Sequence, residues 1–349
     1  MRPLPLVDFV SRLGPAVKHG ICQMSSIVSD VGGTNARFAL AAGAGAGLSD
    51  IWTAKCTDFP TIEAAVEAYR ETLGTAKSAR LDAMAIAVAG PVNAETVDVT
   101  NNHWLFNKHD LLSGLSLRRL LVINDFTAQA LAQTDPRDNG NVEILPGESD
   151  ENAPLLVIGP GTGLGVSALI PSANGPIPIE GEGGHVSFSP RNDDERALDA
   201  FMRRHSAHVS AEHFVSGGGL ENIHHFLADR AGQPAGMTAP EIGERAIAED
   251  GLCRDAAMLL LGILGTVITD NVLTLGCWRG VVISGGIVPK LAPLIAHSPF
   301  AERMRKTGLT AHLMEMIPVW MSVDPYAGLR GAEVALGNAH LAPRAVDAA

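Results

Sequence analysis

The feature that most constrains this chain is a pair of glycine-rich turns, each lying between two short apolar runs. The first turn separates residues 27–31 from 36–41, and the second separates 155–158 from 164–170. Short apolar runs bounded by glycine predict buried strands joined by tight turns. Stretches with helical spacing follow both units, which is typical of an α/β protein.

A polar connection separates the two units. Residues 135–152 are rich in Pro, Gly and Asp, as expected where a chain crosses between domains. We therefore predict two α/β lobes rather than one continuous sheet, with 26–135 in a small lobe and 136–325 in a large lobe.

Residues 1–25 show no clear hydrophobic periodicity, and we predict that they form an N-terminal extension. Charged residues interrupt this stretch, so it does not resemble a secretory signal. Met24 lies just before the first predicted strand, which leaves the native start open between Met1 and Met24. The later apolar stretch 256–269 is shorter than the roughly 20 residues of a membrane span and is expected to be a buried helix.

The chain is acidic, with 26 Lys and Arg against 38 Asp and Glu and a net charge of −12. A negative surface suits neither nucleic acid nor an anionic membrane, so an anionic ligand would need a local device such as backbone amides. The four cysteines show no CxxC spacing, which disfavours a cysteine-based zinc site. Reduced thiols and a cytoplasmic location are the expectation.

The two glycine-rich turns are candidate phosphate loops. The first runs from Asp30 to Asn35, and the second, 159–165, holds four glycines in seven positions. Glycine permits positive φ and lets backbone amides approach an anion closely. Neither turn has Walker or Rossmann spacing, so amides and hydroxyls would hold the phosphate, with Mg²⁺ supplying charge near Asp30. The alternative for the first turn is an ordinary hairpin with a solvated Asp30.

Asn124 and Asp125 follow the apolar run 120–123, ahead of a helix expected to start at Phe126. A carboxylate at the carboxyl end of a strand faces the crevice where α/β sheets bind ligands. Asp125 is therefore a candidate general base for a hydroxyl nucleophile. The alternative is that Asp125 caps the helix.

The loop 180–185 combines two carboxylates, three glycines and a histidine, which is typical of polyol recognition. Glu182 and His185 are its candidate ligands, and Glu212 could add a further acceptor. The alternative is a solvated surface loop. Apolar residues alternate over 186–188, which predicts that His185 starts a strand.

Gly285 and Gly286 lie between the apolar run 281–284 and an expected helix. This turn could bring backbone close to a nucleobase or ribose, although a plain tight turn between strand and helix fits equally well. The stretch 216–219 could form another loop that a ligand approaches closely.

Taken in order, these residues resemble the bacterial glucokinase family of the hexokinase–actin superfamily. The resemblance covers Ser26 to Asn338 and implies an actin-like (ribonuclease H-like) fold with ATP and sugar between two lobes. Relatives of the ROK group carry closely spaced cysteines after a histidine, and this chain does not, so it resembles the non-ROK group. The similar stretches are 29–40, 123–130, 158–165, 180–190, 209–220 and 283–290.

The resemblance implies ATP-dependent phosphorylation of D-glucose at its 6-hydroxyl, the first step of glycolysis, by a homodimer. It also implies that 326–349 returns to the small lobe, that Asp125 is the catalytic base and that Asp30 serves the Mg²⁺ site. The implied glucose ligands are Asn124, Glu182, His185 and Glu212. The implied nucleotide ligands are Asp30, Gly32, Gly33, Thr34, Asn35, Gly161, Thr162, Gly163, Gly285 and Gly286. The alternatives are a kinase for another hexose and a non-catalytic sugar-sensing regulator.

Overall fold

The computed structural model describes residues 25–42, 47–78, 81–137 and 139–348. The predicted extension 1–25 therefore lies, apart from Ser25, outside the described residues.

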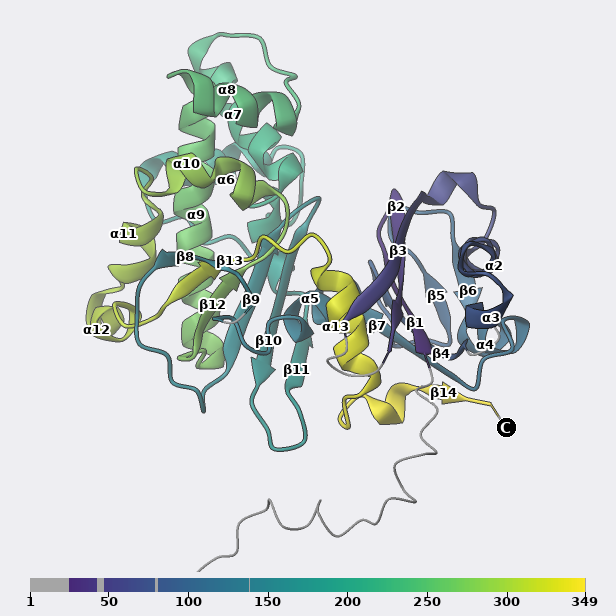
Figure 1. Ribbon diagram of the computed structural model, residues 1–349. Coiled ribbons are helices and arrows are strands. Elements are labelled where there is room, and N and C mark those ends of the chain that lie inside the picture. Colours follow the sequence, from purple (N-terminus) through teal and green to yellow (C-terminus); the bar gives the residue numbers. More distant parts are fainter. Residues whose placement is uncertain (1–24, 43–46, 79–80, 138, 349) are drawn as a thin grey trace, which may run out of the picture.

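Two six-stranded sheets stand side by side (Figure 1). The first contains, in spatial order, β14 (Val346–Asp347), β7 (Arg119–Asn124), β4 (Leu81–Val88), β1 (Ser25–Val31), β2 (Asn35–Ala41) and β3 (Leu48–Lys55). The second contains β11 (Ile177–Gly181), β10 (Leu164–Ile170), β9 (Leu155–Pro160), β12 (Gly280–Ile283), β13 (Val319–Met321) and β8 (Val142–Leu145).

Both sheets combine antiparallel hairpins with parallel strands. In the first sheet β1 and β2 pair antiparallel, while β1, β4 and β7 run parallel. In the second, β9 and β10 form the hairpin and β12 lies parallel to β9. These are the two strand–turn–strand units that the glycine-rich turns predict, and the fold class is confirmed as mixed α/β.

The two faces of the first sheet carry side chains of different size. In β4, Met84 and Ile86 join one buried cluster, whereas Ala85 and Ala87 join another on the opposite face. Alternation follows from the two-residue period of a strand. The alanine face accommodates helices at short range, because small side chains let backbones approach.

Two helices lie between the sheets: α5 (Asp125–Leu131) and α13 (Ala327–Leu336) (Figure 1). They pack so closely that a Cβ on Gly331 would lie 1.7 Å from the carbonyl oxygen of Ala128. A single buried cluster includes residues of both helices and of both sheets. The two sheets are thus joined by a continuous core at these helices.

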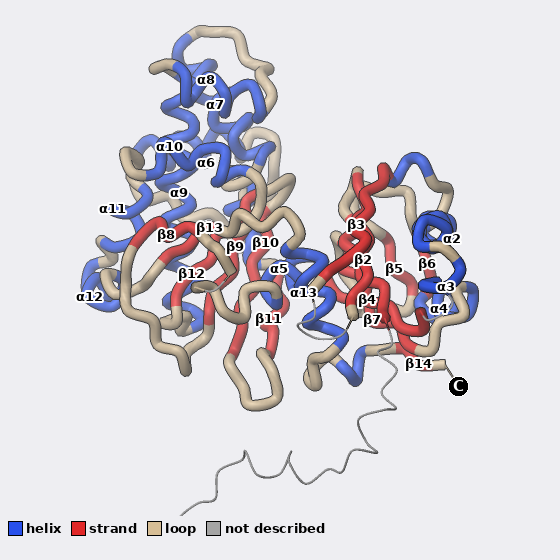
Figure 2. The backbone as a smooth tube through the Cα atoms, in the orientation of Figure 1, coloured by secondary structure: helices blue, strands red, loops and turns tan. Residues whose placement is uncertain are grey.

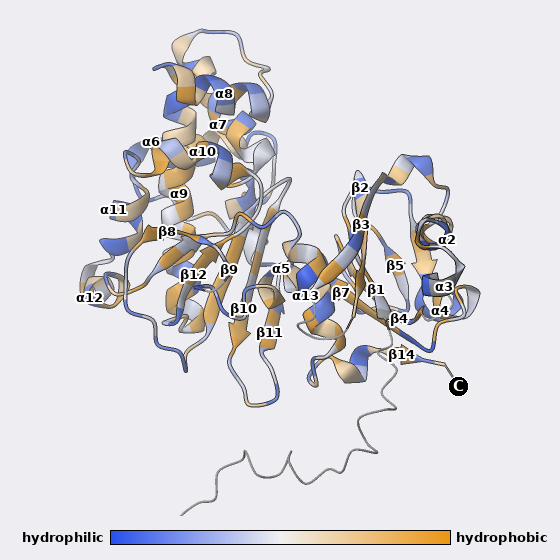
Figure 3. Cartoon of the chain, viewed as in Figure 1, coloured by the Kyte–Doolittle hydropathy of each residue, from blue (hydrophilic) through white to orange (hydrophobic). Residues whose placement is uncertain are grey.

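Helices cover the second sheet on the side away from α5 (Figure 2). The central one is α9 (Leu252–Leu275), which packs against α7 (Gly217–Ala231), α8 (Ala239–Ala248) and α11 (Phe300–Arg305). Among the described residues, α9 is the one helix long and apolar enough to cross a membrane, yet 72% of its apolar window is buried. Figure 3 shows apolar residues along β9, β10 and β12, three of the strands in this half of the molecule. The predicted buried helix at 256–269 is confirmed as part of α9.

The remaining elements surround these cores. The first sheet is flanked by η2 (Cys56–Asp58), α2 (Ile62–Leu73), α3 (Thr75–Ser78), α4 (Lys108–Gly114) and the hairpin β5 (Thr96–Asp98) and β6 (Leu105–Asn107). The second half adds η3 (Gly183–His185), α6 (Asp193–Met202), η4 (Ala211–His213), α10 (Ile287–Ile295), η5 (Gly308–Thr310) and α12 (Ala311–Met314). A short η6 (Ala342–Arg344) precedes β14.

Two local predictions are wrong. His185 ends the short helix η3 instead of starting a strand, and among residues 186–188 only an isolated bridge between Ser187 and Ser210 forms. The glycines at 217–219 form the first turn of α7, capped by the Ser216 hydroxyl, which accepts from Gly219 N. A run of glycines disfavours a helix by propensity, so tertiary packing decides here.

We propose that the two sheets mark the two lobes. Residues 26–135 and 326–349 would form the small lobe, because β14 pairs with β7 and α13 packs on β1 and β4. Residues 136–325 would form the large lobe, since they supply every strand of the second sheet.

Candidate active site

The first glycine-rich turn joins β1 to β2 and is closed by a bond from Gly32 N to Asn35 O of 3.0 Å. Neither Gly32 nor Gly33 has positive φ, so the prediction that they serve a left-handed turn is wrong. Gly33 is needed for space, because a Cβ there would lie 3.0 Å from the carbonyl oxygen of Asn101. The Asn102 amide donates to Gly32 O at 3.0 Å and braces the turn from the same side.

Asp30 lies at the end of β1, with only 14% of its side chain exposed. Arg37 donates to its carboxylate at 3.2 Å, yet burial outweighs this contact and raises the pKa of Asp30. Helix α13 passes directly over it, and a Cβ on Gly328 would lie 2.6 Å from the carboxyl carbon. The side chain is therefore not the solvated Asp of an ordinary hairpin.

Asn124 and Asp125 share the start of α5. The helix is capped by Asn124, whose Oδ1 accepts from Phe126 N and Thr127 N at 2.8 and 3.2 Å. The alternative in which Asp125 is the cap is therefore wrong, because Asp125 is the first helical residue. The Asn124 amide also donates to Gly90 O at 3.2 Å, which leaves its second N–H for a ligand.

The pKa of Asp125 is raised to about 7. Burial is the main cause, and the negative charges of Asp30 and Glu182 add to it. A bond from Phe126 N at 2.8 Å acts in the opposite direction but is the weaker effect. A carboxylate with its pKa near neutral is suited to accept a proton at neutral pH.

The ring of Phe126 fixes α5 against the second glycine-rich hairpin. A Cβ on Gly159 or Gly165 would lie 2.7 or 2.1 Å from this ring. Because these two glycines have no side chains, the ring of Phe126, the residue that follows Asp125, can pack directly against their backbone. The packing of Phe126 thus holds the start of α5, which carries the candidate base Asp125, against the second loop.

The second loop contacts two other elements. Gly217 N, in the first turn of α7, donates to Gly161 O at 2.9 Å, and Gly161 N donates to Gly163 O at 2.8 Å. Glu212 accepts from Leu164 N at 2.7 Å, and its carboxylate would lie 2.5 Å from a Cβ on Gly163. The amide-rich start of α7 beside this loop could not be found from sequence, because its glycines resemble a loop.

The three predicted sugar ligands of the large lobe come together around His185. Its two ring nitrogens lie 4.0 Å from Glu182 and 3.9 Å from Glu212. The side chains of His185 and Glu182 are 60% and 75% exposed, whereas that of Glu212 is 31% exposed. Of these three groups, Glu182 lies near enough to Asp125 for its charge to raise the pKa of that residue.

Glu180 lies near the end of β11, at the start of the same segment, and its side chain is 24% exposed. One carboxylate oxygen accepts from the Thr127 hydroxyl at 2.8 Å, and the other accepts from Arg344. Both oxygens are thus committed to protein groups.

Gly285 and Gly286 lie between β12 and α10, as predicted. Gly285 has φ of +88°, and a Cβ there would lie 2.5 Å from Pro160 O. This turn therefore packs on the end of β9. Next to it, Ser284 donates to the Gln129 side chain on α5 at 2.8 Å.

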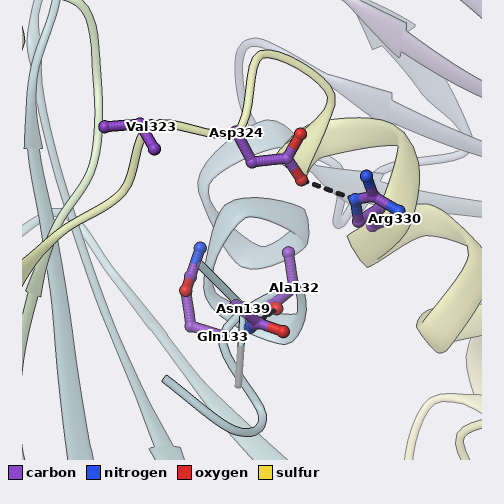
Figure 4. A pocket seen from close by; sticks show the side chains of 6 residues that line it. All are labelled: Ala132, Gln133, Asn139, Val323, Asp324 and Arg330. Carbon is purple, nitrogen blue, oxygen red and sulfur yellow. Dashed lines mark hydrogen bonds and ion pairs between the residues drawn. The ribbon is translucent and has the colours of Figure 1, made fainter. Parts of the chain in front are cut away.

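One cavity lies away from these residues. It has a volume of about 390 Å³ and is lined by Ala132, Gln133, Asn139, Val323, Asp324 and Arg330 (Figure 4). A smaller one, of about 180 Å³, lies behind the loop at Gly183 and reaches α9 at Thr266. Neither cavity includes Asp125. In the first cavity, the charged groups of Asp324 and Arg330 pair with each other at 2.6 Å (Figure 4).

The donor chemistry near Asp125 fits a magnesium ion. Mg²⁺ prefers oxygen ligands and is usually held by one or two carboxylates together with waters and substrate phosphates. Asp30 and Asp125 are neighbouring, desolvated carboxylates with raised pKa values, a setting that a divalent cation would relieve. No cluster of three or more metal-ligating side chains occurs among the described residues, so the substrate would have to complete the coordination.

Comparison with known proteins assigns the family. The family model for glucokinase matches residues 27–339. The chain belongs to the glucokinase family. It is 39% identical over 314 residues to the glucokinase of Neisseria gonorrhoeae, covering 89% of this chain and 94% of that one. It is 40% identical over 315 residues to the glucokinase of Campylobacter jejuni, with the same coverage.

The solved structures agree with this assignment. A glucokinase from an Antarctic psychrotroph superposes with a TM-score of 0.81 at 32% identity, covering 90% of this chain and 99% of that one. The resemblance read from the sequence is thus confirmed, and with it the actin-like fold.

Proposed function

We propose that this chain phosphorylates D-glucose at its 6-hydroxyl with ATP as the phosphoryl donor. Membership of the glucokinase family supports ATP-dependent phosphorylation of glucose. The observation that carries the chemistry is Asp125, a desolvated carboxylate with its pKa at about 7, beside polar groups suited to a sugar.

In this proposal Asp125 takes the proton of the sugar 6-hydroxyl as the hydroxyl oxygen forms a bond to the γ-phosphorus of ATP. The bond between that phosphorus and the β–γ bridging oxygen breaks, and ADP leaves. Phosphoryl transfer depends mainly on positioning and charge stabilisation, and a base orients the nucleophile. Asn124, Glu182, His185 and Glu212 would bind the other hydroxyls. Glu212 would also link sugar and nucleotide, because it bonds the backbone of the second glycine-rich hairpin.

The nucleotide would lie along the glycine-rich segments. We assign Asp30, Gly32, Gly33, Thr34 and Asn35 to one phosphate loop, Gly161, Thr162 and Gly163 to the other, and Gly285 and Gly286 to the adenosine side. Bound Mg²⁺ would supply the positive charge that this acidic site lacks. Asp30 would orient the water shell of the ion. Closure of the lobes would exclude competing water.

A coupled assay with glucose, mannose, fructose and N-acetylglucosamine, each with MgATP, tests the proposal. We expect the highest kcat/KM with glucose. A higher kcat/KM with another hexose would identify that hexose as the preferred substrate. Binding of glucose without turnover would favour the sugar-sensing alternative. We further propose that the protein is a cytoplasmic homodimer. Light scattering during gel filtration would test the dimer by measuring the molar mass of the eluting species.

A further inference from the structure

We propose that Glu180 is a positioning residue for this reaction, acting through Thr127 and Arg344 rather than on the sugar. The inference rests on the proposed function of the site. Its basis is a carboxylate whose two oxygens are taken by two elements that are far apart in sequence.

The first contact reaches the helix that carries Asp125. Thr127 is two residues beyond Asp125, the residue as a whole is 1% exposed, and its hydroxyl donates to Glu180 Oε1 at 2.8 Å. The same residue's backbone N–H is held by the Asn124 cap. A bond to Thr127 therefore acts on the first turn of α5, where the position of Asp125 is set.

The second contact reaches the end of the chain. Arg344 lies in η6, just before β14 pairs with β7 of the first sheet. Glu180 itself lies in β11, at the edge of the second sheet, paired with Ser167 of β10. The Glu180–Arg344 pair thus connects the two halves of the molecule.

The third connection is covalent. Two residues after Glu180 the chain presents Glu182, and η3 follows with His185. A displacement of Glu180 would move the sugar loop relative to Asp125. One carboxylate therefore fixes the distance between the sugar-binding groups and the base, a quantity on which phosphoryl transfer depends strongly.

Steady-state kinetics of Thr127→Val and Arg344→Met, with glucose and MgATP, test the proposal. Valine keeps the shape of threonine without its hydroxyl, and methionine removes the charge of arginine. We expect each change to lower kcat about ten-fold with less than about two-fold change in the KM for glucose, because misplacement affects the transition state most. The double variant should lose less than the product of the two single losses, since both act through Glu180.

Two further variants complete the design. Arg344→Lys keeps the charge and should recover part of kcat, although it lacks the planar fork of arginine. Arg119→Met is the matched control: Arg119 binds Asp347 in the same C-terminal segment at 2.7 Å, but within the first sheet, and kcat should stay unchanged.

Thermal unfolding of each protein separates positioning from stability. Folded variants of Thr127 and Arg344 with the parent's kcat would overturn the inference, as would a loss equal to that of Arg119→Met. If Thr127→Val does not fold, Glu180→Gln and Arg344→Lys decide the question by the same readout. Absence of glucose phosphorylation in the parent protein would instead contradict the proposed function.

Discussion

Asp125 shows how opposing effects are resolved at a single residue. Its place in the first turn of α5 and its bond from Phe126 N favour the ionised form. Burial and the charge of Asp30 oppose this, and the raised pKa shows that they prevail. The residue is therefore held near its point of titration, as a base operating at neutral pH requires.

Asp125→Asn should keep the shape of the site but remove the proton acceptor. We expect kcat to fall by about 10²–10⁴-fold with little change in glucose affinity. Single-turnover kinetics and glucose titration measure the two quantities separately. Asp110→Asn is a suitable control, since Asp110 lies in the first turn of α4, which Asn107 caps as Asn124 caps α5. A near-normal kcat for Asp125→Asn would remove Asp125 from the mechanism.

The same pKa predicts opposite effects of pH on stability and on activity. A carboxyl group whose pKa rises on folding from 3.8 to about 7 binds more protons in the native state within that interval, so its stabilising contribution is lost as pH rises through it. Asp125→Asn should therefore unfold at a higher temperature than the parent at pH 8, with the gap closing towards pH 4. Calorimetry across this range measures the effect. As the pH is lowered below about 7, the kcat/KM of the parent protein should decrease, because Asp125 becomes protonated.

Glu182→Gln tests the sugar site with a change of charge at constant size. Loss of one charge-assisted hydrogen bond costs about 1.5–3 kcal/mol, which corresponds to about ten- to a hundred-fold in glucose affinity. Because the phosphate loops lie on other segments, binding of a non-hydrolysable ATP analogue should be unaffected. Isothermal titration of each ligand alone gives both values. Equal weakening of the two would mean that Glu182 supports the fold.

At the scale of elements, glycine determines how α5 and its partners fit together. Phe126 rests on Gly159 and Gly165, and α13 crosses α5 at Gly331. The sequence predicts that Gly159 and Gly165 belong to a turn, because packing between distant segments cannot be seen in a single sequence. The apolar runs, in contrast, locate the strands well: 164–170 coincides with β10, and 155–158 lies within β9.

The candidate site, too, could be predicted only in part from the sequence. Asp125 and the group around His185 follow from residue types at strand ends and in one polar loop. The contacts of Glu180 with Thr127 and Arg344 could not be predicted, because these partners lie 53 and 164 residues away in sequence. The first turn of α7 was hidden by its glycines, whose low helix propensity is overridden by the contact with Gly161.

Gly165→Ala tests the packing of the Phe126 ring against Gly165. The added Cβ would lie 2.1 Å from the ring, so α5 must shift. We expect a loss of about 1–3 kcal/mol in the free energy of unfolding, typical of overpacking, together with a reduced kcat. Urea denaturation and steady-state kinetics measure the two effects. Phe126→Leu should partly restore stability in the Gly165→Ala background, and Gly114→Ala, where no atom lies within 4 Å, is the neutral control.

At the scale of the whole molecule, one buried cluster joins both sheets through α5 and α13. The two halves therefore share a hydrophobic core at these helices, while the predicted ligands lie at the ends of strands and in loops beside it.

Removal of the first 23 residues tests how much of the chain this architecture needs. Residues 1–25 lack periodic apolar residues, and the family match begins only at residue 27. A protein that starts at Met24 retains all of β1, so it should fold, unfold at the same temperature within about 2 °C and keep the parent's kcat/KM for glucose. Calorimetry and the coupled assay on both proteins provide the comparison. Aggregation or loss of activity on truncation would show that the segment packs on a lobe or on a second subunit, which gel filtration of the two proteins would distinguish.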